Sequence, residues 1–147
     1  MNRIASTLLT LVAALGLVVL PAVTAAHASG CTAATLTGSY GSVSFGFNTN
    51  RPPRGIYYPT DNLGVVRFDG TGNFSTSWTN VSNGEVSRGL TGSGSYTVNS
   101  DCTGSAAFTS GDAAGFTFDF VIVSSGAEVL LTETQGGDTA IFDLKKQ

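Results

Sequence analysis

Hydrophobic and polar residues alternate along most of the chain after Gly38, in short segments separated by Gly, Asn, Asp and Ser. A period of two residues is typical of strands that bury one face, and no segment shows the 3.6-residue period of an amphipathic helix. The pattern predicts eight strands, at residues 39–48, 63–69, 73–81, 85–98, 102–110, 114–123, 127–135 and 138–145. We therefore expect an all-β fold.

The short connections predict which side chains face the core. Several have three residues and end on glycine, as in Gly70-Thr71-Gly72, Ser82-Asn83-Gly84 and Ser124-Ser125-Gly126. Three-residue hairpin loops of this form pair residues of equal parity, so the even-numbered residues from 64 onward are expected to face inward. The inward set includes Phe74, Trp78, Leu90, Phe118, Phe120, Leu130 and Phe142, and the outward set includes Ser75, Ser77, Thr91 and Thr117. From the first strand we expect inward Val43, Phe45 and Phe47.

Two architectures bury one face of eight sequential strands: a closed barrel and a two-layer β-sandwich. Every predicted connection is a hairpin between neighbours, which favours an eight-stranded antiparallel up-and-down meander barrel. Gly92 and Gly94 lie inside the long fourth strand, where glycines suit the bend that a barrel needs. The sandwich is the alternative.

The N-terminal residues have the pattern of a secretory signal peptide. A basic start at Met1–Arg3 precedes an apolar run at Leu8–Leu20, which is short for a membrane span, and Ala26-His27-Ala28 forms a cleavage site. We expect residues 1–28 to be removed and residues 29–147 to form a single barrel domain. A secreted or periplasmic location follows.

Two cysteines, Cys31 and Cys102, remain after this cleavage. An even number in an exported protein favours a disulfide. The alternative is a lipoprotein acylated at Cys31, because Ala28-Ser29-Gly30-Cys31 loosely resembles a lipobox. A disulfide would tether the N-terminal segment to one end of the barrel, where it could act as a plug, so the opposite end is the expected mouth.

The composition excludes several kinds of chemistry. The only histidine, His27, lies in the signal peptide, which argues against Ser-His-Asp triads, Cys-His pairs and nearly every zinc or copper site. We expect no metal and no cofactor. Without Arg3, six basic residues remain against ten acidic ones, so nucleic acid is not an expected partner. No later segment is apolar enough to span a membrane.

Some motifs resemble known barrel families. Gly38-Ser39-Tyr40 resembles the opening of avidin- and lipocalin-type barrels, the calycin group, and Gly92–Tyr96 is similar to the allene-oxide-cyclase barrel type. Together with Cys31, Asp69-Gly70 and Asp101-Cys102, they resemble small secreted bacterial proteins of unassigned function. The resemblance implies a ligand-binding barrel or a cyclase.

Arg88 is the most informative candidate for the site. The expected register places it on the inner wall beside Trp78, where a ligand anion would supply the missing counter-charge; the alternative is that it lies at the rim and extends into water. The long loop 49–62 lies at the same end and is either a binding loop or an ordinary surface excursion. The expected ligand-binding residues are Arg88, Trp78, Arg51, Arg54, Tyr57, Tyr58, Phe45, Phe47, Phe116 and Phe118.

Three functions remain open. The first is a secreted barrel that binds an apolar or amphipathic small molecule, with an acid group a suggested feature. The second is a cofactor-free cyclase or isomerase that uses Tyr57, Tyr58, Arg88 and Asp61. The third is a structural protein with a filled core. A cavity above roughly 300 Å³ would favour the first two over the third.

Several outward positions are apolar. On a sheet face expected to be polar, such residues indicate an interface, coverage by residues 29–38, or scattered exposure. An interface would make the protein a homo-oligomer through Val121, Val123, Val129, Leu131 and Ile141.

Overall fold

The computed structural model describes residues 30–48, 56–135 and 138–147. The expected signal peptide and the loop residues Arg51 and Arg54 lie outside these ranges. Two short 3-10 helices, η1 (Ala33–Thr35) and η2 (Ser124–Gly126), accompany eight strands. The strands are β1 (Thr37–Asn48), β2 (Tyr58–Asp69), β3 (Asn73–Ser82), β4 (Glu85–Val98), β5 (Thr103–Gly111), β6 (Thr117–Val123), β7 (Glu128–Glu133) and β8 (Asp138–Lys146).

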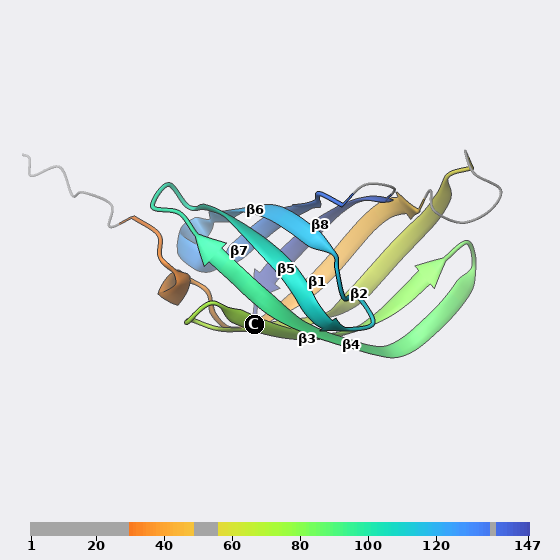
Figure 1. The fold of residues 1–147 in the computed structure, drawn as a ribbon, viewed down its shortest axis with the longest axis horizontal. Coiled ribbons are helices and arrows are strands. Elements are labelled where there is room, and N and C mark those ends of the chain that lie inside the picture. Colours follow the sequence, from red (N-terminus) through yellow and green to blue (C-terminus); the bar gives the residue numbers. More distant parts are fainter. Residues whose placement is uncertain (1–29, 49–55, 136–137) are drawn as a thin grey trace, which may run out of the picture.

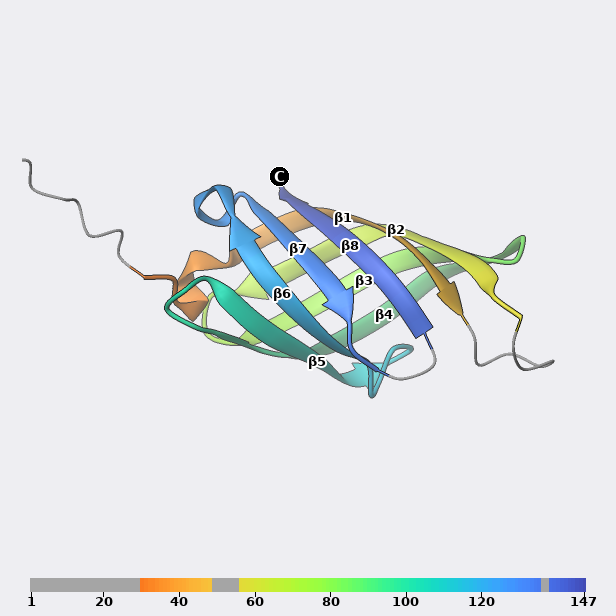
Figure 2. The ribbon, with the colours of Figure 1, turned by 90° about the horizontal axis from the view of Figure 1, so that it is seen from above.

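The strands form a closed antiparallel barrel in sequence order, which confirms the predicted up-and-down meander (Figure 1). Each strand pairs with the next, and β8 closes the ring against β1 with Ile141 opposite Phe45 (Figure 2). The strands begin and end close to their predicted bounds except β2, which begins at Tyr58 rather than at residue 63. The connection between β1 and β2 is therefore shorter than the predicted loop 49–62. Within the described residues, no helix is long and apolar enough to cross a membrane.

The predicted even-numbered inner face is confirmed in most strands. Phe74, Phe118 and Phe120 are buried, and Phe142 packs against the core. The β2–β3 turn pairs Phe68 with Phe74, so Gly70-Thr71-Gly72 preserves the parity as expected. The outward residues Ser75, Ser77, Thr91 and Thr117 are exposed.

The prediction for β1 is wrong, because its even-numbered residues face inward. Tyr40 is fully buried and Ser44 is 1% exposed, whereas Phe45 is 65% exposed. Tyr40 pairs with the inward Val66 of β2, and this register fixes the orientation of the whole strand. Apart from Tyr40, the inner positions of β1 carry Ser, Gly and Asn, so its hydrophobicity pattern points to the wrong face.

The prediction for β7 is also wrong. Leu130 is 40% exposed, while Val129 is fully buried and Leu131 packs against the core. Val123 pairs with Glu128, so four residues rather than three connect β6 to β7 and the parity reverses. Val129 and Leu131 therefore cannot contribute to the predicted interface. Two other residues predicted for it, Val121 and Ile141, are exposed.

The β3–β4 hairpin differs from the prediction in a way that relocates Arg88. Ser82 pairs with Glu85, so the connection is the two-residue turn Asn83-Gly84, in which both residues have positive φ as in a type I′ turn. A bulge then shifts the pairing by one residue, so that even-numbered residues again pair with even-numbered ones and Trp78 pairs with Leu90. Arg88 lies at this bulge and is exposed. Its predicted pairing with Trp78 on the inner wall is wrong.

One end of the barrel is closed by the segment before β1. Cys31 is bonded to Cys102 across 71 residues, which confirms the predicted disulfide. Leu36 is fully buried, and the Tyr96 hydroxyl donates to the carbonyl oxygens of Ala33 and Leu36 at 3.0 and 3.1 Å. Figure 1 shows η1 at this end and the β3–β4 hairpin at the other. The prediction that the disulfide-linked segment plugs this end is confirmed.

Candidate functional site

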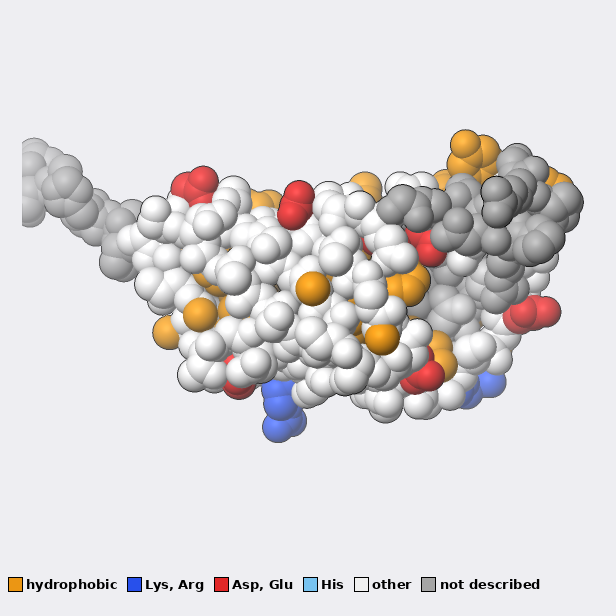
Figure 3. Space-filling model, in the orientation of Figure 1, with side chains coloured by type: hydrophobic (Ala, Val, Ile, Leu, Met, Phe, Trp, Pro, Cys, Tyr) orange, Lys and Arg blue, Asp and Glu red, His pale blue; other side chains and the backbone are white. Residues whose placement is uncertain are grey.

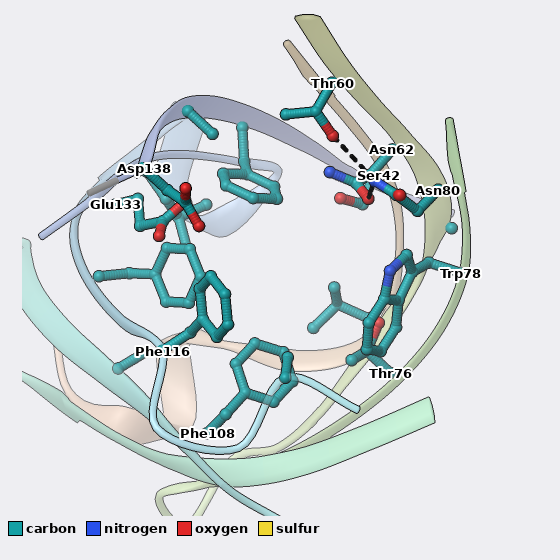
Figure 4. A pocket seen from close by; sticks show the side chains of 18 of the residues that line it. Ser42, Thr60, Asn62, Thr76, Trp78, Asn80, Phe108, Phe116, Glu133 and Asp138 are labelled. Atoms are coloured by element: carbon teal, nitrogen blue, oxygen red, sulfur yellow. Dashed lines mark hydrogen bonds between the residues drawn. The ribbon is translucent and has the colours of Figure 1, made fainter. Parts of the chain in front are cut away.

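The barrel contains a cavity of about 270 Å³ in the half opposite η1. Strands β1, β2, β3, β5, β6, β7 and β8 and the β5–β6 connection all contribute to its lining. Two of its walls differ in chemistry, as Figure 4 shows. The lining residues that the argument uses are Thr60, Asn62, Thr76, Trp78, Asn80, Ser82, Phe108, Asp112, Phe116, Phe118, Glu133, Asp138 and Phe142.

Inward aromatic residues of β3, β5, β6 and β8 form an aromatic wall. Phe108 lies at its centre, with ring centroids 5.0 Å from Phe74, 6.1 Å from Trp78 and 5.9 Å from Phe118. Phe118 in turn packs edge-to-face against Phe142 at 5.2 Å. These geometries are the favoured ones for aromatic pairs, so the wall is a stable apolar surface. Gly64 faces inward opposite Trp78. A Cβ at this position would collide with the Ser77 carbonyl oxygen and with Trp78 Cβ, so glycine lets the two strands pair here with Trp78 in place.

A polar wall lies on β1, β2 and β3. Asn80 Nδ2 donates to Thr60 Oγ1 and to Asn62 Oδ1, both at 2.9 Å. Asn62 Nδ2 donates to Ser44 Oγ at 2.8 Å. The amides therefore hold one another in fixed orientations. Ser82, at the end of β3, is 4% exposed and its hydroxyl has no hydrogen-bond partner.

Two acidic side chains, Glu133 and Asp138, face the cavity together (Figure 4). Glu133 Oε1 and Asp138 Oδ1 are buried and have no hydrogen-bond partner in the described part of the chain. Burial, with the negative charge of Asp138 as a smaller cause, raises the pKa of Glu133 to about 7. Glu133 thus changes its charge near neutral pH.

The sequence-based argument missed Glu133 because it placed the odd-numbered residues of this strand outside. The available signal was that Glu133 alternates with the apolar residues Val129 and Leu131, which places all three on the same face of the strand. Among the described residues, no group of three His, Cys, Asp or Glu is arranged to hold a metal ion.

The structure brings together some of the predicted site residues and separates others. Trp78, Phe47, Phe116 and Phe118 line the cavity. Arg88 is exposed at the bulge of β4, and Phe45 is exposed on the outer face of β1. Tyr57 is 66% exposed and packs against Phe47 with centroids 6.2 Å apart. Five of the predicted site residues are described but do not line the cavity: Phe45, Tyr57, Tyr58, Asp61 and Arg88. Two others, Arg51 and Arg54, lie outside the described residues.

Comparison with known proteins adds no assignment. No protein-family model matches the chain, and no curated protein matches it either. The class is thus defined by the fold and the site: an eight-stranded up-and-down β-barrel, closed at one end by a disulfide-linked segment, with an aromatic and acidic cavity in the other half.

Proposed function

We propose that the protein binds an apolar or amphipathic small molecule inside the barrel. The observation that carries this proposal is a cavity with an aromatic wall and buried polar atoms that have no hydrogen-bond partner among the residues that the structure describes. Apolar cavities with a few convergent polar groups are typical of small-molecule sites, because the apolar wall supplies affinity and the polar groups select orientation. Buried polar atoms without partners cost free energy that a ligand can recover.

The cavity volume limits the size of the ligand. At about 270 Å³ it does not exceed the roughly 300 Å³ that would by itself favour a ligand over a filled core, and it lies below the range that holds drug-sized ligands. A dry cavity of about 150 Å³ already binds benzene. We therefore expect a ligand of roughly ten non-hydrogen atoms, with a single aromatic ring or a short aliphatic body.

We propose a secreted or periplasmic location for this binding protein. The Cys31–Cys102 disulfide supports it, since such bonds persist in oxidising compartments. The predicted signal peptide supports it independently. Association of copies through exposed Val121 and Ile141 stays a prediction.

The proposal is tested with 2-phenylethanol, which matches the expected size and carries no charge. Trp78 is the only tryptophan of the chain and lines the cavity, so indole fluorescence reports occupancy directly. We expect a saturable change. Thr76→Phe, which fills the cavity, should abolish binding measured by calorimetry, whereas Ser77→Phe at the adjacent exposed position should retain it. A native protein that shows no saturable signal, or equal binding by both variants, contradicts the proposal.

A cofactor-free isomerase is the second candidate, and Glu133 favours it. A carboxyl group whose pKa lies at about 7 in an aromatic cavity is suited to take a proton from a ligand carbon and return it to another. Such chemistry predicts that a bound carbonyl compound acquires deuterium from heavy water, and that Glu133→Gln abolishes the exchange. Equal exchange in the variant would exclude this role.

A further inference from the structure

We propose that the ligand carries a protonated amine, which binds between Glu133 and Asp138 while its apolar body lies against the aromatic wall. The inference rests on the proposed binding function and names the chemical class of the ligand. It differs from the acid-bearing ligand that Arg88 suggested, because Arg88 lies outside the cavity.

The two carboxyl groups lack the partners that a buried acid needs. One oxygen of each is buried without a hydrogen bond to any described residue, and the groups face each other across β7 and β8. Buried acids are normally paired with a cation or a donor, since an isolated charge in a low-dielectric site is costly. A cation placed between them would satisfy both oxygens and relieve their mutual repulsion.

The charge of the cavity selects a cation over an anion. Among the described residues that line it, the charged ones are Asp112, Glu133 and Asp138, and all three are acidic. Asp112 is already engaged, because its Oδ2 accepts a hydrogen bond from the Thr91 amide at 2.8 Å. A ligand carboxylate would meet like charge at Glu133 and Asp138. An ammonium group instead offers three donors to their oxygens.

The aromatic side chains next to the acids fit the rest of such a ligand. Phe116 lies beside Glu133 and Asp138 in Figure 4, and the aromatic wall continues from there through Phe118 and Phe108 toward Trp78. An aromatic face attracts a cation as well as an apolar body. A ligand with an amine at one end and an aromatic ring at the other therefore matches the cavity, in which the acidic pair is followed by the aromatic wall.

Ser82 is an independent sign that the cavity is built for a polar ligand atom. Its hydroxyl is buried and unpartnered, and it lines the cavity from β3, on the polar wall. Unlike the carboxyl groups it carries no charge, so charge repulsion does not account for its lack of a partner. It provides a second polar contact for the ligand, away from the acids.

The test compares three molecules of nearly equal size: 2-phenylethylamine, 2-phenylethanol and phenylacetate. Calorimetric titration at pH 8 keeps Glu133 ionised, because its pKa is about 7. We expect the amine to bind about ten- to a hundredfold more tightly than the alcohol, as is usual for charge-assisted hydrogen bonds in a buried site. We expect phenylacetate to bind more weakly than the alcohol.

Variants locate the preference. Glu133→Gln and Asp138→Asn should each reduce the amine-to-alcohol ratio to within about threefold of one, and this ratio, not the affinity for the alcohol alone, is the quantity that tests the proposal. Asp119→Asn is the matched control, since it removes one negative charge from an exposed position on β6. It should keep the full preference. Circular dichroism verifies that each variant is folded.

The outcomes separate the two proposals. Equal binding of amine and alcohol, or tighter binding of phenylacetate, overturns the cationic ligand and leaves the binding function standing. A preference for the amine that survives both Glu133→Gln and Asp138→Asn also overturns it. Failure of all three molecules to bind overturns the binding function itself, and the cationic ligand with it.

Discussion

At the scale of the residue, single positions decide the chemistry of the site. Trp78, Phe116 and Phe118 could be predicted, because large apolar residues at even positions of an alternating strand have one plausible location. Glu133 could not, because a charged residue is expected to face solvent and only the register of β7 turns it inward. Arg88 was the opposite case: a predicted inner cation that a bulge moves to the surface. Of the predicted site, Trp78, Phe47, Phe116 and Phe118 thus line the cavity, whereas Phe45 and Arg88 lie outside it.

Glu133 makes stability depend on pH. Its pKa rises from 4.5 to about 7 on folding, so the folded protein holds the proton more tightly than the unfolded chain does. The stabilising contribution of Glu133 to the free energy of unfolding is therefore fully present below pH 4.5. It is lost as the pH rises through about 7. Because the side chain is only partly buried, we expect a loss on the order of 1–2 kcal/mol rather than the full value for such a shift.

Urea unfolding at pH 4.5 and at pH 8 measures this dependence. Other groups also contribute to the pH dependence of stability, so the quantity compared is the difference between the native protein and Glu133→Gln. The variant should gain on the native protein as the pH rises. A difference that stays constant between the two pH values would show that Glu133 is not perturbed by its burial.

At the scale of the element, turns decided where the predicted faces were correct. Gly70-Thr71-Gly72 kept the parity, and its Asp69 carboxylate accepts hydrogen bonds from the Thr71 and Asn73 amides at 2.7 and 2.9 Å. Together with hydrogen bonds from the Asn73 side-chain amide, which is the largest cause, and from the Thr71 hydroxyl, they hold the pKa of Asp69 well below its usual range. Asn83-Gly84 is a strong two-residue turn signal, because both positions accept positive φ, and it outweighs the three-residue interpretation. Ser124-Ser125-Gly126 has no such signal, and Ala127 extends that loop to four residues.

The reversed face of β7 predicts opposite effects for two adjacent residues. Val129 is fully buried and Leu130 is 40% exposed, so Val129→Ala should lower the free energy of unfolding by about 2–3 kcal/mol. Leu130→Ala, although it deletes a larger side chain, should cost less than about 1 kcal/mol. Chemical denaturation of both variants makes the comparison. The ranking would be inverted if three residues connected β6 to β7, because Leu130 would then face the core.

At the scale of the whole molecule, the two ends of the barrel have separate tasks. The meander places alternate turns at alternate ends, which is why the sequence alone could predict the end at which the disulfide tethers the N-terminal segment. The plugged end is held by the disulfide, by buried Leu36 and by the hydroxyls of Tyr40 and Tyr96. On the face seen in Figure 3 the charged side chains are few and lie apart from one another. Inside the barrel, by contrast, two acidic side chains, Glu133 and Asp138, lie close together.

This separation predicts that stability and binding respond differently to loss of the disulfide. Replacing both Cys31 and Cys102 by Ser opens a loop of 71 residues, which in the chain-entropy model lowers the free energy of unfolding by about 4 kcal/mol. The cavity lies in the opposite half, so its lining remains in place as long as the barrel is folded. We expect the double variant to unfold at a lower urea concentration yet to bind 2-phenylethanol within about twofold of the native affinity in the absence of urea. Urea unfolding and calorimetry on the same preparation provide both values. A folded double variant that has lost binding would mean that the plug shapes the cavity from across the barrel.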